Sequence, residues 1–301
     1  MEEKNVRPLM PFYGGAAFSV NVIINLLISL IAGAIIAAFS LKGSEGSKYI
    51  SALVSPAAIA VTSLVFFKVT RLPVKEVLPL KSKPKYFLIG LLLIFGLLFS
   101  LNSLNDLLVK LFELMGYTRK PPDNIPDFSG WNVLPALIAL AVLPAIAEEV
   151  LFRGILLNGA QSGTGSILAI VFSGLCFSLY HGSVEQTIYQ FICGCLFAFL
   201  AVRSHSIAPS IVIHFLNNAI IIILCACGLA DMQTGELLIP AAAQIVLTVL
   251  SALSLVGGIL WLILDKTELK NSQDGGVVKF LIGASIGIVA MVVIWISNLF
   301  L

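Results

Sequence analysis

Long apolar stretches recur along the whole chain and are separated by short polar connections. Each holds about 20 residues, the length of helix that crosses the roughly 30 Å hydrocarbon core of a bilayer. The pattern predicts an all-α bundle of eight or nine membrane-crossing helices, at about residues 13–39, 50–69, 86–108, 132–157, 165–181, 186–203, 207–228, 239–264 and 278–301. The segment 165–181 is short, and the polar residues of 102–114 favour a helix along the membrane interface.

Composition agrees with this pattern. The 301 residues are 58% hydrophobic and only 11% charged, whereas soluble domains carry about 25% charged residues. The first apolar stretch is much longer than the 7 to 15 residues of a signal-peptide core, so we expect it to be retained. A net charge of +2 gives no electrostatic basis for binding nucleic acid. We therefore expect residues 1–301 to form a single integral, multi-pass membrane domain.

Basic residues are distributed unequally between the two sides of the membrane. If nine stretches cross, one side carries twelve Lys and Arg and the other carries five, Arg153 being left out as an intramembrane residue. The twelve are Lys4, Arg7, Lys68, Arg71, Lys75, Lys81, Lys83, Lys85, Arg203, Lys266, Lys270 and Lys279, and the five are Lys42, Lys48, Lys110, Arg119 and Lys120. The positive-inside rule then predicts a cytoplasmic N-terminus, although one non-crossing segment would reverse the later assignments.

Three charges interrupt the fourth apolar stretch, in the sequence Glu148-Glu149-Val150-Leu151-Phe152-Arg153. A charge at bilayer depth costs about 2.5 to 3.5 kcal/mol on insertion scales, which marks a functional site. Glu149 and Arg153 are four residues apart on one helix face and are expected to form an ion pair. Glu148 lies about 100° around the helix, free to act as a general base. The alternative is a purely structural, salt-bridged helix contact.

Pro144 lies four residues before Glu148. Proline has no amide hydrogen to donate, so the carbonyl of Leu140 is left without its helical partner. We expect a kink or a water pocket beside the glutamates.

Two later segments carry histidine at positions that suit proton transfer. In Phe177-Ser178-Leu179-Tyr180-His181 an apolar helix ends in histidine, which titrates near neutrality and can share a proton with a glutamate or bind a metal. It could instead cap the helix at the membrane surface. His205, near Arg203, is expected at the interface.

His214 and Asn218 are four residues apart and project from one helix face. Two donors that point to one place can hold the oxyanion of a tetrahedral intermediate. Asn217 is a less favoured partner for His214. The alternative is interhelical hydrogen bonding, which is common for buried Asn and His in membrane bundles.

The longest polar connection, Gly116 to Gly130, contains the Pro, Gly and Asn of an irregular loop. It precedes the helix that carries the glutamates. It could therefore cover the site or guide a substrate, or it could be a simple connector.

Together the three motifs resemble the CAAX prenyl endopeptidase and bacteriocin-processing family (CPBP or Abi), intramembrane proteases related to Rce1. The family pattern is Glu-Glu-x-x-x-Arg, then Phe-x-x-x-His, then His-x-x-x-Asn, and EEVLFR, FSLYH and HFLNN occur here in that order. The resemblance covers about 75 residues, from Pro144 to Asn218. It implies an eight-helix type of bundle with a four-helix catalytic core, here 132–228, and a polar cavity near the cytoplasmic side.

The resemblance also implies roles for individual residues. Glu148 would be the base that activates water, helped by His181, while His214 and Asn218 would stabilise the oxyanion. Glu149 and Arg153 would support the site. Glu148, His181 and His214 also form a possible zinc set of the His/His/carboxylate type. The chain has no HExxH motif, and we favour a mechanism without a metal or other cofactor.

The predicted function is an intramembrane endopeptidase in the plasma membrane of a prokaryote. Its substrate would be a membrane-associated protein or peptide, either a prenylated CAAX-type protein or a bacteriocin or leader peptide. One alternative is a proton-coupled transporter, since intramembrane acids suit that class, although no second copy of the motif indicates related halves. Another is a non-catalytic bacteriocin-immunity protein of the same fold.

Overall fold

The structure is a computed structural model that describes residues 9–119, 125–231 and 236–300. Within these ranges the chain is almost entirely helical, and its only β-pairing is one isolated bridge between Ala230 and Leu237. The predicted all-α fold is confirmed. Seven described segments are long and apolar enough to cross a membrane, so the chain is an integral multi-pass membrane protein.

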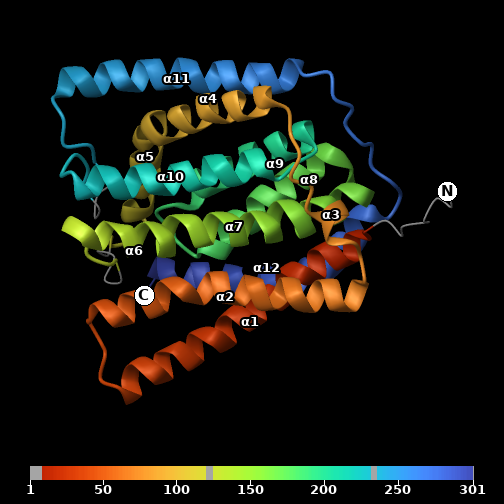
Figure 1. The fold of residues 1–301 in the computed structure, drawn as a ribbon, viewed down its shortest axis with the longest axis horizontal. Coiled ribbons are helices and arrows are strands. Elements are labelled where there is room, and N and C mark those ends of the chain that lie inside the picture. Colours follow the sequence, from red (N-terminus) through yellow and green to blue (C-terminus); the bar gives the residue numbers. More distant parts are fainter. Residues whose placement is uncertain (1–8, 120–124, 232–235, 301) are drawn as a thin grey trace.

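The helices follow one another in a simple order (Figure 1). They are α1 (Pro11–Ala38), α2 (Glu45–Thr70), α3 (Val74–Val77), α4 (Pro84–Ser100), α5 (Asn102–Leu114), η1 (Gly130–Asn132), α6 (Val133–Leu137), η2 (Ile138–Val142), α7 (Leu143–Glu149), η3 (Val150–Leu157), α8 (Asn158–His181), α9 (Thr187–Ser204), α10 (Ala208–Ala226), α11 (Ala241–Leu264) and α12 (Gly276–Phe300).

The longest apolar segment, Gly130–His181, folds back on itself at Gly165. Gly165 has φ 75° and ψ 170°, a combination that essentially only glycine adopts. The two arms are antiparallel, because Ser173 Oγ donates to the carbonyl of Phe152 at 3.3 Å and the rings of Phe152 and Phe177 lie 5.2 Å apart. The segment thus makes the two passes predicted at 132–157 and 165–181. With α4, a shorter apolar helix, the described chain makes nine passes.

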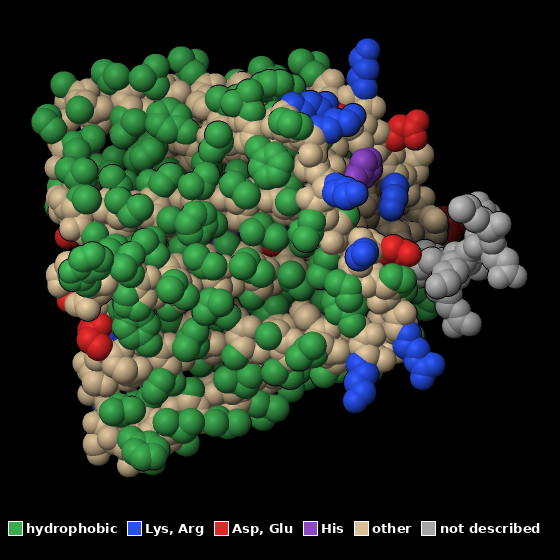
Figure 2. Space-filling model, viewed as in Figure 1, with side chains coloured by type: hydrophobic (Ala, Val, Ile, Leu, Met, Phe, Trp, Pro, Cys, Tyr) green, Lys and Arg blue, Asp and Glu red, His purple; other side chains and the backbone are tan. Residues whose placement is uncertain are grey.

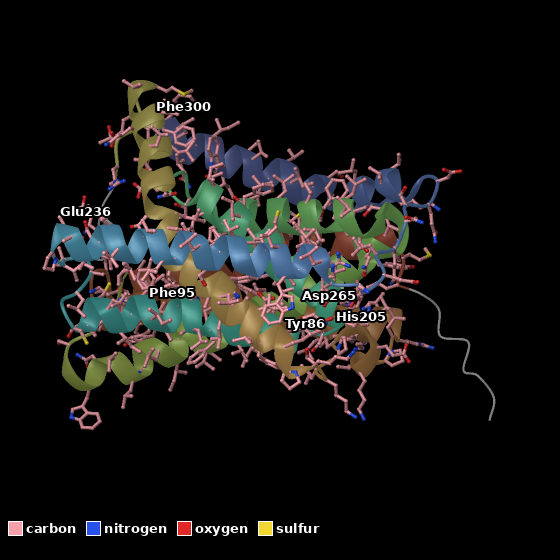
Figure 3. All side chains as sticks on the ribbon, turned by 90° about the horizontal axis from the view of Figure 1, so that it is seen from above. Tyr86, Phe95, His205, Glu236, Asp265 and Phe300 are labelled. Atoms are coloured by element: carbon pink, nitrogen blue, oxygen red, sulfur yellow. The ribbon has the colours of Figure 1, made fainter. Side chains whose placement is uncertain are left out.

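The predicted third stretch, 86–108, is two helices. α4 ends at Ser100, and α5 begins at Asn102 in a new direction, which Figure 3 shows as a helix turned away from the axis of α4. This break agrees with the separate amphipathic helix expected at 102–114. Only α4 continues the packed bundle.

α1 and α12 run parallel and begin at the same end of the bundle (Figure 1). Ser19 Oγ donates to the carbonyl of Gly283 at 2.7 Å and accepts from the amide of Gly287 at 3.0 Å. A side chain on Gly15 would lie 2.8 Å from the amide nitrogen of Ala284, so glycine is what allows this close approach. Because the first and last passes are parallel, the described chain ends on the side opposite to where it starts.

The connections divide between two ends of the bundle. One, here called the basic end, holds 71–83, 205–207, 265–275 and the turn at Gly165; the amides of Ile207 and Ser166 donate to the carbonyls of Pro79 and Lys270, each at 2.9 Å. Figure 2 shows most Lys and Arg of one face gathered there, beside an apolar surface. The other, here called the loop end, holds 39–44, 115–119, 125–129, 182–186 and 227–231. In Figure 3 His205 and Asp265 lie at the first end, and Glu236 at the second.

α8 and α9 are short for a membrane crossing. From Gly165, α8 has 16 further residues to His181, about 24 Å at 1.5 Å per residue, which is less than the roughly 30 Å hydrocarbon layer. α1 has 28 residues. The loop 182–186 is therefore set back from the surface of the bundle, and His181 lies at the depth of Glu148 rather than at a membrane surface.

Candidate active site

The carboxylate of Glu148 faces two histidines from different helices. Its Oε2 lies 3.9 Å from Nε2 of His181 and 3.8 Å from Nε2 of His214. These distances are longer than direct hydrogen bonds but suit groups joined through one water. α7, α8 and α10 supply the three residues, and Glu148 is 7% exposed. The bundle therefore brings together three ionisable groups that the sequence separates by up to 66 positions.

Both imidazole rings are held through Nδ1. His214 Nδ1 lies 2.9 Å from Oε1 of Glu149, and His181 Nδ1 lies 2.8 Å from the carbonyl of Phe177. A carbonyl and an ionised carboxylate only accept hydrogen bonds, so Nδ1 carries a hydrogen in each ring. Nε2 of each ring is then the atom directed at Glu148, available to accept or to carry a proton.

The predicted pair of Glu149 and Arg153 forms in the most buried part of the site. Arg153 Nη1 lies 2.8 Å from Oε1 of Glu149, with both side chains fully buried. Nη2 donates to the carbonyl of Gly194 at 3.1 Å, and the guanidinium lies 4.5 Å from the ring centre of Phe177. The aromatic ring adds a cation–π contact. Arg153 thus balances the charge of Glu149, and Glu148 is left facing the histidines.

Close packing of α8 and α9 gives Arg153 its carbonyl partner. A side-chain carbon on Gly194 would lie 2.7 Å from the Cα of Gly174, so the two backbones touch without intervening side chains. This approach brings the Gly194 carbonyl to the guanidinium. A larger residue at either position would collide with the facing helix, so both positions require glycine.

The carbonyl that Pro144 leaves free has a partner from another helix. Asn218 Nδ2 donates to the Leu140 carbonyl at 3.1 Å. Leu140 lies in η2, a widened π-helical turn that ends just before the proline. The sequence predicts the free carbonyl, and the structure supplies the Asn218 side chain that satisfies it. Because an amide nitrogen carries two hydrogens, Asn218 keeps one further donor.

A small cavity of about 50 Å³ joins the predicted catalytic residues. Glu148, His181, His214 and Asn218 all line it, whereas Glu149 and Arg153 do not. A water molecule occupies about 30 Å³ in the liquid, and the lining offers it several polar partners. The arrangement therefore has a carboxylate, two imidazole nitrogens and an amide around a space of the size of a water molecule.

A larger chamber of about 730 Å³ adjoins this cavity. The two share Gln190, Asn217 and Asn218 in their linings. Tyr117 and Ile125, from the described parts of the connection Gly116 to Gly130, line the chamber. Residues 120–124 of that connection lie outside the described residues. The chamber is the space left where α8 ends at His181 and α9 begins at Thr187, and it lies at the loop end.

Two polar residues of the site, Tyr189 and Gln190, were not singled out from the sequence, and Asn217 was only a less favoured partner for His214. Tyr189 donates to Oδ1 of Asn217 at 2.7 Å, and Asn217 Nδ2 donates to Oδ1 of Asn218 at 3.0 Å. This chain directs the nitrogen of Asn218 toward Leu140. Gln190 lines both cavities. Polar residues inside the apolar stretch 186–203 were the available signal for Tyr189 and Gln190.

Tyr117 marks the polar rim of the chamber. Its hydroxyl donates to Oε1 of Glu185 at 2.7 Å. Burial, followed by the hydrogen bond to Glu185, raises the pKa of Tyr117 well above its usual value. The phenol therefore stays protonated near neutrality and remains a hydrogen-bond donor.

In the zinc set considered from the sequence, Glu148, His181 and His214, the ligand atoms lie slightly farther apart than around a bound zinc ion. Tetrahedral zinc with bonds of about 2.0 to 2.2 Å holds its ligand atoms about 3.3 to 3.6 Å apart, whereas Glu148 Oε2 lies 3.8 and 3.9 Å from the two imidazole nitrogens. Across the described ranges, no group of three or more His, Cys, Asp or Glu is placed to hold a metal ion. We derive no step through zinc.

Comparison with known families supports the motif assignment. Residues 130–220 match the family described as type II CAAX prenyl endopeptidase, Rce1-like. The matched segment contains all seven residues of the three motifs, from Glu148 to Asn218, and confirms the resemblance. Because this is a family of proteases, the match supports a hydrolase at the level of the family. No curated protein and no solved structure matches the chain.

Proposed function

We propose that this chain, whose residues 130–220 match the Rce1-like family, is an intramembrane endopeptidase in which Glu148 activates a water molecule. The observation that carries the proposal is the small cavity where Glu148 meets His181, His214 and Asn218. A chamber large enough for a peptide segment leads to it. The substrate is a peptide bond in a membrane-associated protein or peptide.

The first step is attack by water on the peptide carbonyl. The water sits between Glu148 and the imidazole nitrogens, at separations that suit one bridging molecule. Glu148 takes one proton while the water oxygen forms the bond to the carbonyl carbon. The carbonyl oxygen becomes an oxyanion, held by the free N–H of Asn218 and by Nε2–H of His214.

The second step breaks the bond between carbon and nitrogen. The proton taken by Glu148 passes to the leaving amine, with His181 as the relay. His214 can donate only when both of its nitrogens are protonated, because Nδ1–H already binds Glu149. Glu149 accepts the hydrogen bond from that Nδ1–H, and its own partner inside the bundle is Arg153.

The direct test uses purified protein and an internally quenched mixture of decapeptides with apolar centres and Lys at both ends. We expect the wild type to cleave the mixture and Glu148→Gln to lose at least about 10³-fold in rate, the upper part of the range for acid–base catalysis. Glu113→Gln, an exposed acid on α5, is the matched control. Full activity of Glu148→Gln, or no cleavage by the wild type, contradicts the assignment.

Metal independence is part of the proposal and has its own test. Cleavage should persist after dialysis against EDTA and 1,10-phenanthroline. Glu148 and the two histidines would then act by proton transfer and hydrogen bonding alone. Loss of activity that added zinc restores would instead make Glu148, His181 and His214 metal ligands.

One observation favours proton-coupled transport as the second candidate. A cavity of about 210 Å³ at the basic end reaches Arg153, while the small cavity reaches Glu148 from the other side. The buried pair of Glu149 and Arg153 thus lies between two polar spaces. Proton flux that depends on Glu148, in proteoliposomes without any peptide, would favour the transporter over the protease.

A further inference from the structure

We propose that the substrate enters the chamber from the extracytoplasmic side of the membrane, so that the protein cleaves an apolar peptide segment presented on the outer face. The proposal rests on the protease function above and adds the side from which the site is loaded. It follows from two independent differences between the ends of the bundle. One is the number of basic residues, and the other is the position of the chamber that adjoins the site.

Charge is distributed unequally between the two ends. Among the described residues, the basic end carries ten Lys and Arg and the loop end carries four. The ten are Lys68, Arg71, Lys75, Lys81, Lys83, Lys85, Arg203, Lys266, Lys270 and Lys279, and the four are Lys42, Lys48, Lys110 and Arg119. An excess of Lys and Arg in short connections marks the cytoplasmic side. The basic end is therefore cytoplasmic, and the loop end faces outward.

The connections at each end are joined to one another, so the two groups of charges belong to opposite faces. At the basic end, Asn158 Nδ2 donates to the carbonyl of Val77 at 3.0 Å. At the loop end, Asn298 Nδ2 donates to the carbonyl of Gly182 at 2.9 Å. Figure 2 shows the blue side chains at one end of the apolar surface. Because the described chain crosses the bundle nine times, successive connections alternate between the two ends.

The cavity that holds Glu148 adjoins a larger space at the loop end, which is the end opposite to most of the basic residues. The chamber of about 730 Å³ is lined at the loop end by Tyr117, Glu185 and Asp231. It reaches the site cavity through the residues that the two share. By contrast, the cavity at the basic end has no lining residue in common with the site cavity. Among the described residues, the site cavity therefore adjoins a space at the loop end and none at the basic end.

Between Glu148 and the basic end the bundle is closely packed. Leu151, Phe152, Ile155 and Leu156 follow Glu148 toward that end and are all fully buried. The pair of Glu149 and Arg153 is fully buried beside them. A substrate that entered from the cytoplasmic side would have to push these packed side chains apart to reach Glu148.

The lining of the chamber indicates the chemistry of the substrate. Leu98, Phe99, Ile221 and Ile222 provide apolar walls, and amide side chains such as Gln190 provide donors and acceptors for a peptide backbone. The volume lies within the roughly 300 to 1,000 Å³ typical of ligand pockets. An extended apolar segment at the outer surface fits both features. A lipid-modified C-terminus in the cytoplasmic leaflet would lie on the wrong side, in contrast to the cavity position implied by the family resemblance.

Native cysteines allow the orientation to be measured. Cys227 is exposed at the loop end, whereas Cys176 and Cys193 are buried. A membrane-impermeant maleimide added to intact cells should label the wild type, and labelling should be lost in a Cys225→Ser/Cys227→Ser variant. Adding Lys75→Cys to that variant, at the exposed α3 position, should restore labelling only after the cells are permeabilised. Labelling of Lys75→Cys in intact cells, or of Cys227 only after permeabilisation, overturns the orientation.

Sidedness of cleavage tests the loading route itself. The impermeant Lys-ended decapeptide mixture is added to sealed vesicles of either orientation, with the Glu148→Gln protein as background. We expect cleavage above background in right-side-out vesicles, and in inside-out vesicles only after detergent. Equal cleavage in both, or the reverse order, overturns this inference and leaves the protease function intact. Absence of Glu148-dependent cleavage even in detergent overturns the protease function, and the loading route with it.

Discussion

His214 Nδ1 lies 2.9 Å from Oε1 of Glu149, the same oxygen that receives Nη1 of Arg153 at 2.8 Å. One carboxylate oxygen therefore serves two purposes: it neutralises a buried guanidinium, and it orients a histidine from another helix. Substitutions can separate the two effects.

We expect Glu149→Leu to lower the free energy of unfolding by about 3 to 5 kcal/mol, because Arg153 would keep a buried charge without its partner. Adding Arg153→Met should restore most of this loss, since an apolar pair of similar size avoids the burial of charge. Cleavage should stay low in both variants, because His214 lacks its acceptor. Unfolding in mixed micelles and rates of peptide cleavage measure the two effects. Wild-type cleavage by the double variant would show that Glu149 is only a charge partner.

Pro144→Ala tests the link between the helix break and the catalytic amide. The new N–H at position 144 can donate to the carbonyl of Leu140 and compete with Asn218. We expect cleavage to fall, by less than the 10²- to 10³-fold cost of losing an oxyanion donor outright. Thermal unfolding should show equal or greater stability. Pro135→Ala, in the same helical segment, should leave the rate unchanged, and equal effects of the two changes would contradict this account.

Gly165→Ala should destabilise the fold at the turn between the two antiparallel arms. The backbone at φ 75° and ψ 170° costs a non-glycine residue about 1 to 3 kcal/mol, and the new carbon would lie 2.8 Å from the amide nitrogen of Ser272. Gly257→Ala is the control, because nothing lies within 4 Å of a side chain there. It should be neutral or slightly stabilising in the same unfolding assay. Equal loss of stability in both variants would exclude strain at Gly165.

Asp265 should make the stability of the basic end depend on pH. Burial raises the pKa of Asp265, but the hydrogen bonds from Lys85 and Thr267 outweigh it and hold the pKa well below the usual value. Since the folded pKa is depressed, the stabilisation is complete above the unfolded pKa of about 3.9 and is lost as pH falls toward the folded value. Unfolding at several pH values should therefore show Asp265→Asn less stable than wild type at pH 7. The difference in stability between wild type and Asp265→Asn should shrink below about pH 4. A difference that does not change with pH would show that the charge of Asp265 is not what stabilises the basic end.

Features that depend on residues near one another in sequence were predictable. The nine passes follow from apolar length, and the pair of Glu149 and Arg153 follows from a spacing of four on one helix. Pro144 predicts the free carbonyl of Leu140 by the same local argument. The end of α4 at Ser100 was harder to predict, because the sequence of α5 continues the helical pattern although the helix changes direction there.

Contacts between helices depend on how the bundle packs, which helical periodicity does not determine. The bond from His214 to Glu149 spans 65 positions, and the bond from Asn218 to Leu140 spans 78. The family resemblance placed these residues near one site but gave no partner for either. The link from Tyr189 to Asn217 was missed for the same reason. The catalytic roles remain predictions that the activity tests decide.

The pairing of Glu149 with Arg153 also bears on how the chain is made. Both residues lie in one helix, so this segment already carries matched charges when the translocation machinery releases it into lipid. His214 is synthesised 65 residues after Glu149, and the acid does not depend on it for neutralisation during that interval. Glu148 has no such partner within its own helix. The helix is therefore inserted with one carboxyl group that lacks a partner in the same helix, and this is the group that we propose activates water.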